Sequence, residues 1–596
     1  MASTSDVITL ENFVHKMPRW DYDLPSHLYA LVDMGRFVMP SPLTSYSNGI
    51  RFSISDLSPS RTRLLRCIYR ERAAISLFDA LNLSPTGEPL TFQADVIAQV
   101  AKALARFKSI ANEFGVPAEH FSVFATEAMR KAENATSMLG AIFETSGLSV
   151  HVLAPEVETL FGAMGARSEF SDVNGLFLDL GGGSVQMTYL NSSMDGYEMA
   201  AAHAGKSLPF GAAKLIKVLE SAETEAQITA TSTLQEGMRG VFAELQQQFP
   251  PLKDTQTNRK GGGVDIYLCG GGFRGYGSIL MHTDPIQPYP IPTVGTYTVT
   301  GSFFRQTESM RKMNTEYEGK IHGMSKRRRQ QFPAIATVVE ALVEAVPRIH
   351  TVTFCGGGNR EGALYMMLPK TLRETNPLPY LREVHDKVEQ ETLESVIALV
   401  GSSLPADFDF SGIPTVYTLG LGPLFAGGIW ARAGGSSDTH AAYELHQAIH
   451  RDPDTPGFTH LARAILGITL YFRWGASLGP SDRQLLANLQ KVVSRSNPDA
   501  NFWAEYLGAV ANLLAIIFPA KPATPDKLKN GVTFNSHITN EKTKTNVRLI
   551  VSLSSTASHV PETEELASCF RDVGKHRDVI GEIDREVELI VQKTKL

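Results

Sequence analysis

The residues best suited to chemistry in this 596-residue chain lie in residues 176–190, which read LFLDLGGGSVQMTYL. An apolar run closes at Asp179, and a second run alternates apolar and polar residues, so the pattern predicts two strands joined by a tight tip. The residues at that tip are Gly181, Gly182, Gly183 and Ser184. Because glycine has no side chain, backbone N–H groups can crowd around an oxyanion, and the serine hydroxyl adds a donor. The stretch therefore predicts a phosphate site beside a carboxylate.

Two other phosphate-binding motifs fit this stretch poorly. A P-loop needs Gly-Lys followed by Ser or Thr at the start of a helix, and a dinucleotide site needs G-x-G-x-x-G at the start of a helix. Here the glycines open a strand, which disfavours both motifs. The remaining alternative is a glycine-rich turn that binds no ligand.

A second stretch near the N-terminus has the same form. Residues 28–35 are apolar up to Asp33 and end at Gly35, and alternation resumes at 50–54. Residues 36–46 interrupt the pattern with two prolines. Without them, the tip of a second hairpin would consist of Ser47, Asn48 and Gly49. The chain therefore reads as an internal duplication, and two such hairpins facing each other would hold a polyphosphate or the phosphates of a nucleotide.

Two helices expected between these hairpins carry further candidates. Thr126 and Arg130 lie one helical turn apart, so both side chains could face a phosphate site. In the helix expected over 155–166, Glu158 is a candidate base, because a buried or anion-flanked carboxylate has a raised pKa suited to accepting a proton from water. For each of these residues the alternative is an ordinary solvated helix position.

Two more glycine clusters follow apolar strands further along the chain. The first consists of Gly270, Gly271 and Gly272. Arg274 follows it and could contact a phosphate bidentately, and a helix over 275–281 would form an anion site at its N-terminus. The pattern recurs at 356–358, followed by Arg360. The basic cluster at 326–329 is interpreted as a solvated surface, with nuclear targeting or a polyanion contact as alternatives.

The order of these elements predicts an α/β protein with a helical extension. We expect a polar leader over 1–27, a first lobe over 28–200, a second lobe over 201–375 and a mainly helical domain over 376–596. In the last region strands are expected over 531–555, and two helices are expected to close the chain. The dipeptide His385-Asp386 is reminiscent of metal-dependent phosphohydrolases, but adjacent helix residues point apart, so a docking or scaffold module is favoured.

Composition narrows the class of protein. Hydrophobic residues make up 43% and charged residues 20% of the chain, and its formal net charge of -6 predicts no general attraction to nucleic acid or membranes. The four cysteines lie at neither zinc-ligand nor redox-motif spacing, which suits a reducing compartment. The sequence shows neither a targeting leader nor an apolar run of bilayer length. We therefore expect a cytoplasmic protein, with the nucleus as a second location.

Seven motifs, taken in order, resemble those of one family: VDMG...SNGIRFSI, ATEAMRKAENAT, PEVETLFGAMGA, FLDLGGGSVQM, LPFGAAKL, YLCGGGFRGYGSIL and FCGGGNREGALY. The chain resembles the exopolyphosphatase/guanosine-pentaphosphate phosphohydrolase (Ppx/GppA) superfamily over residues 28–368. This resemblance implies two actin-like (ASKHA, ribonuclease H-like) lobes. It also implies that Asp179 and Asp33 hold Mg²⁺ and that Glu158 activates water. The phosphate contacts that it implies come from 47–49, 181–184 and Arg130.

Gln186 separates the functional hypotheses. Hydrolytic members of the family commonly carry glutamate there, whereas an amide lacks the negative charge that a hard cation favours. We therefore favour a phosphatase-like signalling regulator that binds a nucleotide or polyphosphate. The alternatives are an active exopolyphosphatase or guanosine-polyphosphate phosphohydrolase, which uses Mg²⁺-assisted attack by water, and a sugar-kinase-like phosphotransferase. We also expect a regulatory protein partner at the C-terminal domain, and homodimerisation as an option.

Overall fold

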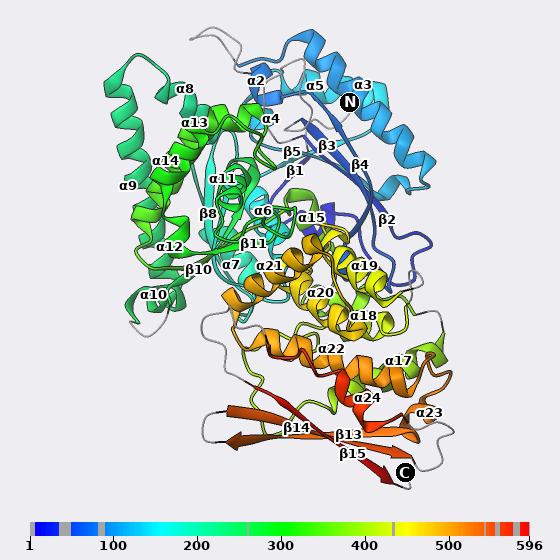
Figure 1. Cartoon of the computed structure of the whole chain (residues 1–596). Coiled ribbons are helices and arrows are strands. Elements are labelled where there is room, and N and C mark those ends of the chain that lie inside the picture. Colours follow the sequence, from blue (N-terminus) through cyan, green and yellow to red (C-terminus); the bar gives the residue numbers. More distant parts are fainter. Residues whose placement is uncertain are drawn as a thin grey trace. The chain divides into compact units, whose positions relative to one another are not determined.

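The computed structural model forms two compact units (Figure 1). The first unit consists of Met1–Thr283, Thr293–Thr375 and Asp454–Pro456, and the second of Asp284–Pro292, Asn376–Pro453 and Gly457–Leu596. The structure describes residues 6–34, 49–81, 90–258, 262–384, 386–431, 436–541, 544–554, 561–575 and 585–594. The insertion at 36–46 therefore lies outside the described residues, and so do Gly35, Ser47 and Asn48.

The first unit contains two six-stranded sheets. The first sheet has the order β1-β6-β5-β2-β3-β4. Its strands are β1 (Asp6–Ile8), β2 (Leu28–Asp33), β3 (Ile50–Asp56), β4 (Arg66–Ala73), β5 (Phe121–Ala125) and β6 (Val150–Leu153). The strands β2, β3 and β4 form an antiparallel meander, whereas β5 and β6 run parallel to β2.

The second sheet, in the order β11-β12-β10-β7-β8-β9, repeats this plan except at one edge, where β11 pairs antiparallel with β12. Its strands are β7 (Asn174–Leu180), β8 (Val185–Asn191), β9 (Lys206–Leu208), β10 (Val264–Cys269), β11 (Tyr297–Thr300) and β12 (Ile349–Phe354). Again a three-stranded antiparallel meander is followed by two parallel strands. The predicted duplication and the two actin-like lobes are therefore confirmed.

The strand pairing differs from two of the predicted boundaries. The expected leader contains β1, which pairs parallel with β6 and so belongs to the first sheet. The strands β7 and β8, assigned from the sequence to the first lobe, lie in the second sheet because β7 pairs parallel with β10. The second lobe therefore begins at Asn174, not at residue 201. Alternation along a strand reveals its faces but not its neighbours, which explains both errors.

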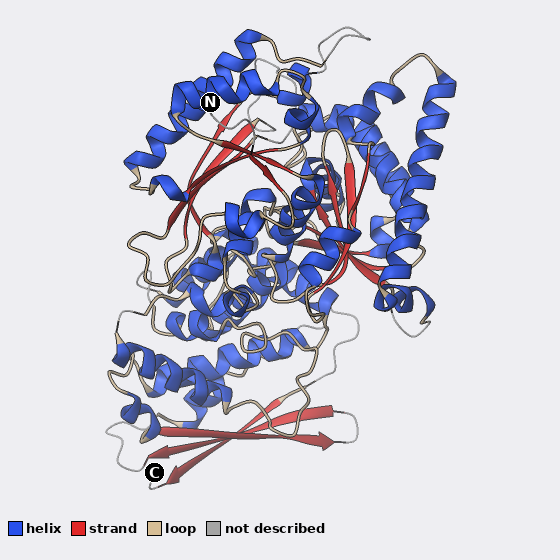
Figure 2. Cartoon of the chain, turned by 180° about the vertical axis from the view of Figure 1, so that it is seen from behind, coloured by secondary structure: helices blue, strands red, loops and turns tan. Residues whose placement is uncertain are grey.

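Figure 2 shows helices packed around these sheets. Those of the first unit are α1 (Phe13–Lys16), α2 (Leu77–Leu81), α3 (Ala94–Glu113), α4 (Glu127–Lys131), α5 (Ala135–Ser146), α6 (Pro155–Arg167), α7 (Tyr197–Ala204), α8 (Ala212–Leu219), α9 (Thr224–Gln248), α10 (Pro250–Thr257), α11 (Gly270–His282), α12 (Gly301–Phe304), α13 (Thr307–Glu316), α14 (Lys326–Ala345), α15 (Asn359–Met367) and α16 (Lys370–Arg373). Phe107 of α3 stacks on Phe52 of β3 at 4.7 Å between ring centroids, which joins this amphipathic helix to the first sheet.

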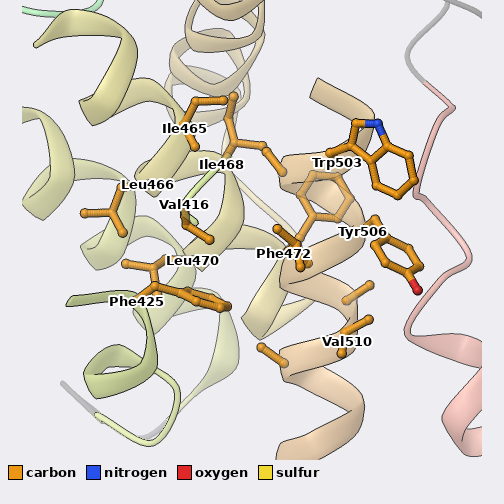
Figure 3. Packing of buried hydrophobic residues seen from close by; sticks show 14 of the residues in the cluster. Val416, Phe425, Ile465, Leu466, Ile468, Leu470, Phe472, Trp503, Tyr506 and Val510 are labelled. Carbon is orange, nitrogen blue, oxygen red and sulfur yellow. The ribbon is translucent and has the colours of Figure 1, made fainter. Parts of the chain in front are cut away.

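The second unit is mainly helical, as predicted. Its helices are α17 (Lys387–Gly401), α18 (Gly422–Gly428), α19 (Ser437–His450), α20 (His460–Trp474), α21 (Pro480–Ser496), α22 (Ala500–Ile517), α23 (Pro525–Lys529) and α24 (Thr563–Ser568). Figure 3 shows part of its core, where Ile468 and Phe472 of α20 lie beside Trp503 and Tyr506 of α22. By length and composition α22 could cross a membrane, but 78% of it is buried in the protein, as is typical of a core helix.

The second unit ends in a three-stranded sheet. Its strands are β13 (Val532–Glu541), β14 (Lys544–Ser554) and β15 (Val587–Thr594). The prediction that two helices close the chain is wrong, because the strand β15 follows α24 and pairs parallel with β14. Asp386 accepts a hydrogen bond from the Glu389 N–H at 2.8 Å and so caps α17, while His385 lies outside the described residues.

The segment Asp284–Pro292 belongs to the second unit although it follows α11 in the chain. The buried carboxylate of Asp284 accepts two hydrogen bonds from Arg495, at 2.7 and 2.9 Å. The Asn488 side chain donates to the Pro288 carbonyl at 2.8 Å. A bidentate pair with one partner fully buried fixes both groups in one geometry, so this segment is an integral part of the second unit.

The helices α6 and α15 cross where both carry glycine. A Cβ atom on Gly165 would lie 2.3 Å from the carbonyl oxygen of Gly358, and one on Gly362 would lie 1.8 Å from that of Phe161. No other residue allows the two backbones to approach this closely. Since α6 follows β6 of the first sheet and α15 follows β12 of the second, this crossing joins the two lobes.

We predict that Gly362→Ala lowers the stability of the first unit by about 1–3 kcal/mol, because the added methyl group overlaps the α6 backbone. Thermal unfolding of the full chain measures the effect. The matched control is Gly240→Ala in α9, where a Cβ atom meets nothing within 4 Å. This control should be neutral or slightly stabilising, since alanine is the better helix former. Equal melting temperatures for Gly362→Ala and the unmodified chain would show that the crossing tolerates separation.

Candidate functional site

Two carboxylates occupy corresponding positions in the two sheets. Asp33 ends β2, the first strand of the first meander, and Asp179 lies next to the end of β7, the first strand of the second. Their residues are 5% and 7% exposed, so both groups are buried at the carboxyl ends of their strands. Gly49, from the tip of the first hairpin, directly precedes β3.

The second glycine turn is an open cradle of N–H groups. The carbonyl groups of this turn already accept hydrogen bonds. The Gly181 carbonyl accepts one from the Ala212 N–H at 3.0 Å, and the Gly182 carbonyl accepts from the N–H groups of Ala213 and Lys214. Gly181 itself donates to the Ser184 carbonyl at 3.0 Å, which closes the turn. Within the described parts of the chain, the N–H groups of Gly182, Gly183 and Ser184 have no acceptor. The turn can therefore receive an oxyanion, as the sequence predicts.

The start of α8 holds this turn in place through a close backbone approach. A Cβ atom on Gly211 would lie 2.2 Å from the carbonyl carbon of Gly182 and 2.3 Å from the Gly183 nitrogen. This explains the glycine in the LPFGAAKL motif. A larger residue would push α8 away and release the carbonyls that it holds.

The third glycine turn packs against Asp179. Gly270 has φ +94°, and a Cβ atom there would lie 2.4 Å from Oδ1 of Asp179, so this position requires glycine. The helix α11 begins at Gly270, five residues before the helix expected from the sequence, and its N-terminus lies against this carboxylate. Gly271 has open space where a side chain would be, whereas Gly272 packs on Leu180. Arg274 donates to the carbonyl of Gly356 at 3.2 Å.

The fourth glycine turn is already filled by carboxylates of the chain itself. Glu169, just beyond the end of α6, accepts hydrogen bonds from the N–H of Gly356 at 3.1 Å and from that of Gly357. Glu361 accepts from the N–H of Gly358 at 3.1 Å. The expectation that the turn over 356–358 repeats the anion site is therefore wrong. Burial raises the pKa of Glu169 to about 8, although the N–H groups that it binds favour its charged form.

Glu158 lies in the first turn of α6 and pairs with Arg130. Nη2 of Arg130 is 3.0 Å from Oε2 of Glu158, and its Nη1 donates to the Leu153 carbonyl at 2.5 Å. The Glu158 side chain is only 18% exposed. Burial raises its pKa to about 7 and the negative charge of Asp33 adds to the rise, whereas Arg130 lowers it. A carboxylate with this pKa can accept a proton near neutral pH, so a base at this position is chemically suitable.

Gln186 lies directly opposite Asp179 in the ladder between β7 and β8. Opposite residues of an antiparallel pair share one face of the sheet, so the amide stands beside the aspartate. The hydroxyl of Thr159, which follows Glu158 on α6, lies 3.5 Å from Oε1 of Gln186. The Gln186 amide therefore belongs to the same group of side chains as the carboxylates of Asp179 and Glu158.

One neighbour of Asp179 was not predicted. Gly162 lies on α6, one turn after Glu158. A Cβ atom on Gly162 would lie 3.8 Å from Oδ2 of Asp179 and 3.5 Å from Oδ1 of Asn359, so both side chains face this glycine. Asn359 begins α15 after the fourth glycine turn. Its position in the GGGNREG motif, at the start of a helix, is the sequence signal that could have identified it.

The acidic residues fit a magnesium ion that also binds a phosphate ligand. The part of the chain that the structure describes has no group of three His, Cys, Asp or Glu residues able to hold a metal. Mg²⁺, however, is commonly bound by one or two carboxylates together with substrate phosphates and water. Asp179 lies two residues before the open glycine turn, and Asp33 acts electrostatically on Glu158. These two carboxylates would suit a metal that arrives with its ligand.

The basic cluster at 326–329 starts α14. Arg329 donates to the carbonyls of Gly319 at 3.0 Å and Asn314 at 2.8 Å, and also to that of Tyr317. This arginine therefore holds the preceding loop, which agrees with a structural interpretation for that residue.

Comparisons with known proteins cover most of the chain. Residues 56–371 match the model of the Ppx/GppA phosphatase family, and residues 381–595 match that of the RTG2 C-terminal domain. Retrograde regulation protein 2 of Saccharomyces cerevisiae is 30% identical over 493 residues, which span 79% of this chain and 80% of that protein.

Two solved structures resemble the first part of the chain. The Aquifex aeolicus member of the Ppx/GppA family is 20% identical, with a TM-score of 0.43, and the match covers 57% of this chain and 97% of that one. An exopolyphosphatase from Cytophaga hutchinsonii is 19% identical, with a TM-score of 0.41, and covers 59% of this chain and 99% of its own.

We predict that Glu158→Gln alters how stability depends on pH. Because the folded-state pKa of Glu158 is raised to about 7, the folded protein keeps a proton that the unfolded chain has already released at lower pH. Stability is therefore lost as the pH rises from the ordinary carboxylate range to about 7, and the variant should lose less. Thermal unfolding at pH values of about 5.5 and 7.5 tests this.

The matched control is Glu156→Gln, at an exposed position two residues earlier on α6. It should leave the pH dependence unchanged. The assignment of the raised pKa to Glu158 would be contradicted by a Glu158→Gln variant whose melting temperature changes with pH as much as that of the unmodified chain.

Proposed function

The chain belongs to the Ppx/GppA phosphatase family, and from that premise we propose that it is a regulator that binds a nucleotide or polyphosphate and turns it over slowly or not at all. The ligand's phosphates would bind the open turn of Gly182, Gly183 and Ser184. The regulatory role is supported by the similarity to retrograde regulation protein 2, and we extend it to signalling from mitochondria to the nucleus.

Gln186 is the observation that carries this proposal. It lies opposite Asp179, in the group of side chains around the open turn, and contributes an amide where a glutamate would contribute negative charge. Mg²⁺ favours anionic oxygen ligands, so the site loses one charge of the kind that would draw the ion to bound phosphates. Binding of phosphates depends on N–H donors that this change leaves intact. We therefore expect the phosphate ligand to bind but to be hydrolysed slowly, so that it stays bound.

The chain's own groups define what the site can do. The open turn orients the phosphates, and Glu158 can hold or accept a proton at its carboxylate. Asp33 and Asp179 would hold Mg²⁺, which when bound neutralises charge on the phosphate oxygens. A ligand that persists can keep the two lobes in one conformation, which suits a sensor.

The C-terminal domain is the proposed contact for a regulatory protein partner. Its match to the RTG2 C-terminal domain distinguishes the chain from one that ends after the family domain. We also propose that the chain forms a homodimer and that it is located in the cytoplasm with access to the nucleus. Neither nucleic acid nor a membrane is proposed as a ligand.

An active exopolyphosphatase or guanosine-polyphosphate phosphohydrolase is the second candidate. The observation that favours it is Glu158, whose pKa of about 7 suits a general base. In this case Glu158 would take a proton from the attacking water while the open turn holds the phosphate. Both candidates use the same site and differ in the rate of turnover.

We predict that Gln186→Glu raises Mg²⁺-dependent phosphate release, because it restores a carboxylate beside Asp179. Phosphate release from tripolyphosphate and from a guanosine polyphosphate measures the gain. Adding Glu158→Gln to the same variant should abolish it, since the base is then lost. Gln186→Ala is the matched control, because it removes the amide without supplying a charge, and it should show no gain.

Rapid phosphate release by the unmodified chain, dependent on Glu158, would favour the hydrolase over the regulator. No gain from Gln186→Glu, with tripolyphosphate still bound, would show that the amide does not limit the chemistry. Failure of the unmodified chain to bind any phosphate ligand would reject both candidates.

A further inference from the structure

Two arginines from different helices lie side by side in the second lobe. Arg274 is on α11, just after the third glycine turn, and Arg328 is in the first turn of α14. Gly275, which follows Arg274, has no side chain, and a Cβ atom there would lie 3.6 Å from Cδ of Arg328. The aliphatic part of Arg328 therefore contacts α11 at the residue after Arg274, and the charge of Arg274 acts on Arg328.

These two positive charges have no counter-ion in the described parts of the chain. Arg274 donates to the Gly356 carbonyl at 3.2 Å, and Arg328 donates to the Gly323 carbonyl at 2.7 Å, but neither forms an ion pair with a described residue. Nε of Arg328 is buried and has no hydrogen-bond partner among the residues that the structure describes. A guanidinium carries five N–H donors, so most of the donors of both groups remain available.

Some arginines of this protein are neutralised by a carboxylate, whereas the buried Arg63 donates to three main-chain carbonyls. Arg167 pairs with Glu374 at 2.6 Å, Arg495 with Asp284 at 2.7 Å and Arg585 with Asp499 at 2.9 Å. By contrast, the positive charge of Arg274 adds to burial in lowering the pKa of Arg328 to about 10. Holding two like charges together without a carboxylate costs stability, which is the arrangement expected where a bound anion supplies the missing charge.

The position of Arg274 on α11 connects the arginine pair with the open turn of Gly182, Gly183 and Ser184. Arg274 lies four residues, or about 6 Å along the helix axis, from the start of α11 at Gly270, which packs against Asp179. Resting on the proposed function, we infer that Arg274 and Arg328 form a second anion subsite, which binds a distal phosphate of a chain whose first phosphate occupies the turn of Gly182, Gly183 and Ser184. The planar fork of arginine suits phosphate oxygens.

With two anion subsites, the length of the phosphate chain determines the affinity. Orthophosphate can occupy the open turn but cannot reach the arginine pair at the same time, whereas a longer phosphate chain can contact both. The phosphates can belong to a free polyphosphate or to a nucleotide, since both present the same oxygens. Tripolyphosphate and ATP are therefore the two probes that distinguish these sources.

Isothermal titration calorimetry on the full chain with orthophosphate, tripolyphosphate and ATP tests the subsite. The unmodified chain should bind tripolyphosphate more tightly than orthophosphate. Arg328→Gln should weaken tripolyphosphate binding by about tenfold or more, the effect of losing hydrogen bonds to a charged group, and leave orthophosphate binding unchanged. Lys326→Gln is the charge-matched control, because it removes an exposed positive charge from the same helical turn, and it should change neither affinity.

A parallel loss of ATP affinity in Arg328→Gln would assign the subsite to a nucleotide, and a loss restricted to tripolyphosphate would assign it to a free chain. Unchanged tripolyphosphate affinity, or equal weakening of orthophosphate, would overturn the subsite while the proposed function stands. If the unmodified chain binds none of the three probes, both proposals fall. Arg274→Gln provides a second variant should Arg328→Gln fail to fold.

Discussion

The contact between the backbones of α6 and α15 is the constraint on which the site depends. Gly165 and Gly358 bring the helices together, and Gly362 lets α15 pass Phe161. The same two helices carry Glu158 and Asn359, which come from different lobes. A crossing without side chains between the helices leaves little freedom to separate, so the groups of the site keep their relative positions through direct backbone packing.

Similar glycine turns have different roles here because their surroundings differ. The turn that ends at Ser184 keeps three N–H groups without an acceptor among the described residues, since α8 engages only its carbonyls. The turn at 356–358 is satisfied by Glu169 and Glu361, so it works as a joint between elements. A cluster of glycines thus shows that backbone N–H groups are accessible, but the neighbouring side chains decide whether a ligand is needed to satisfy them.

The local pattern of apolar and polar residues predicted many of the strands and helices of this protein. Apolar alternation identified both hairpins, and a four-residue tip in the second sets Asp179 opposite Gln186. The sequence pattern did not predict contacts between segments that are far apart along the chain. The pairing of β7 with β10 moved a hairpin into the second lobe, and Arg328 lies beside α11 although more than fifty residues separate it from Arg274. Such contacts arise from the packing of elements, which no periodicity along one element encodes.

The ion pair of Asp284 with Arg495 has a consequence for synthesis of the chain. The two residues are 211 positions apart, so at ordinary translation rates of 5–20 residues per second Asp284 leaves the ribosome roughly 10–40 seconds before its partner. During that interval the two sheets of the first unit can be completed, but Asn488 and Arg495 are not yet available to the segment after α11. The segment is already joined at both ends to residues of the first unit when α21, which carries Arg495, is synthesised. Nascent chains would have to keep this segment solvated until α21 arrives.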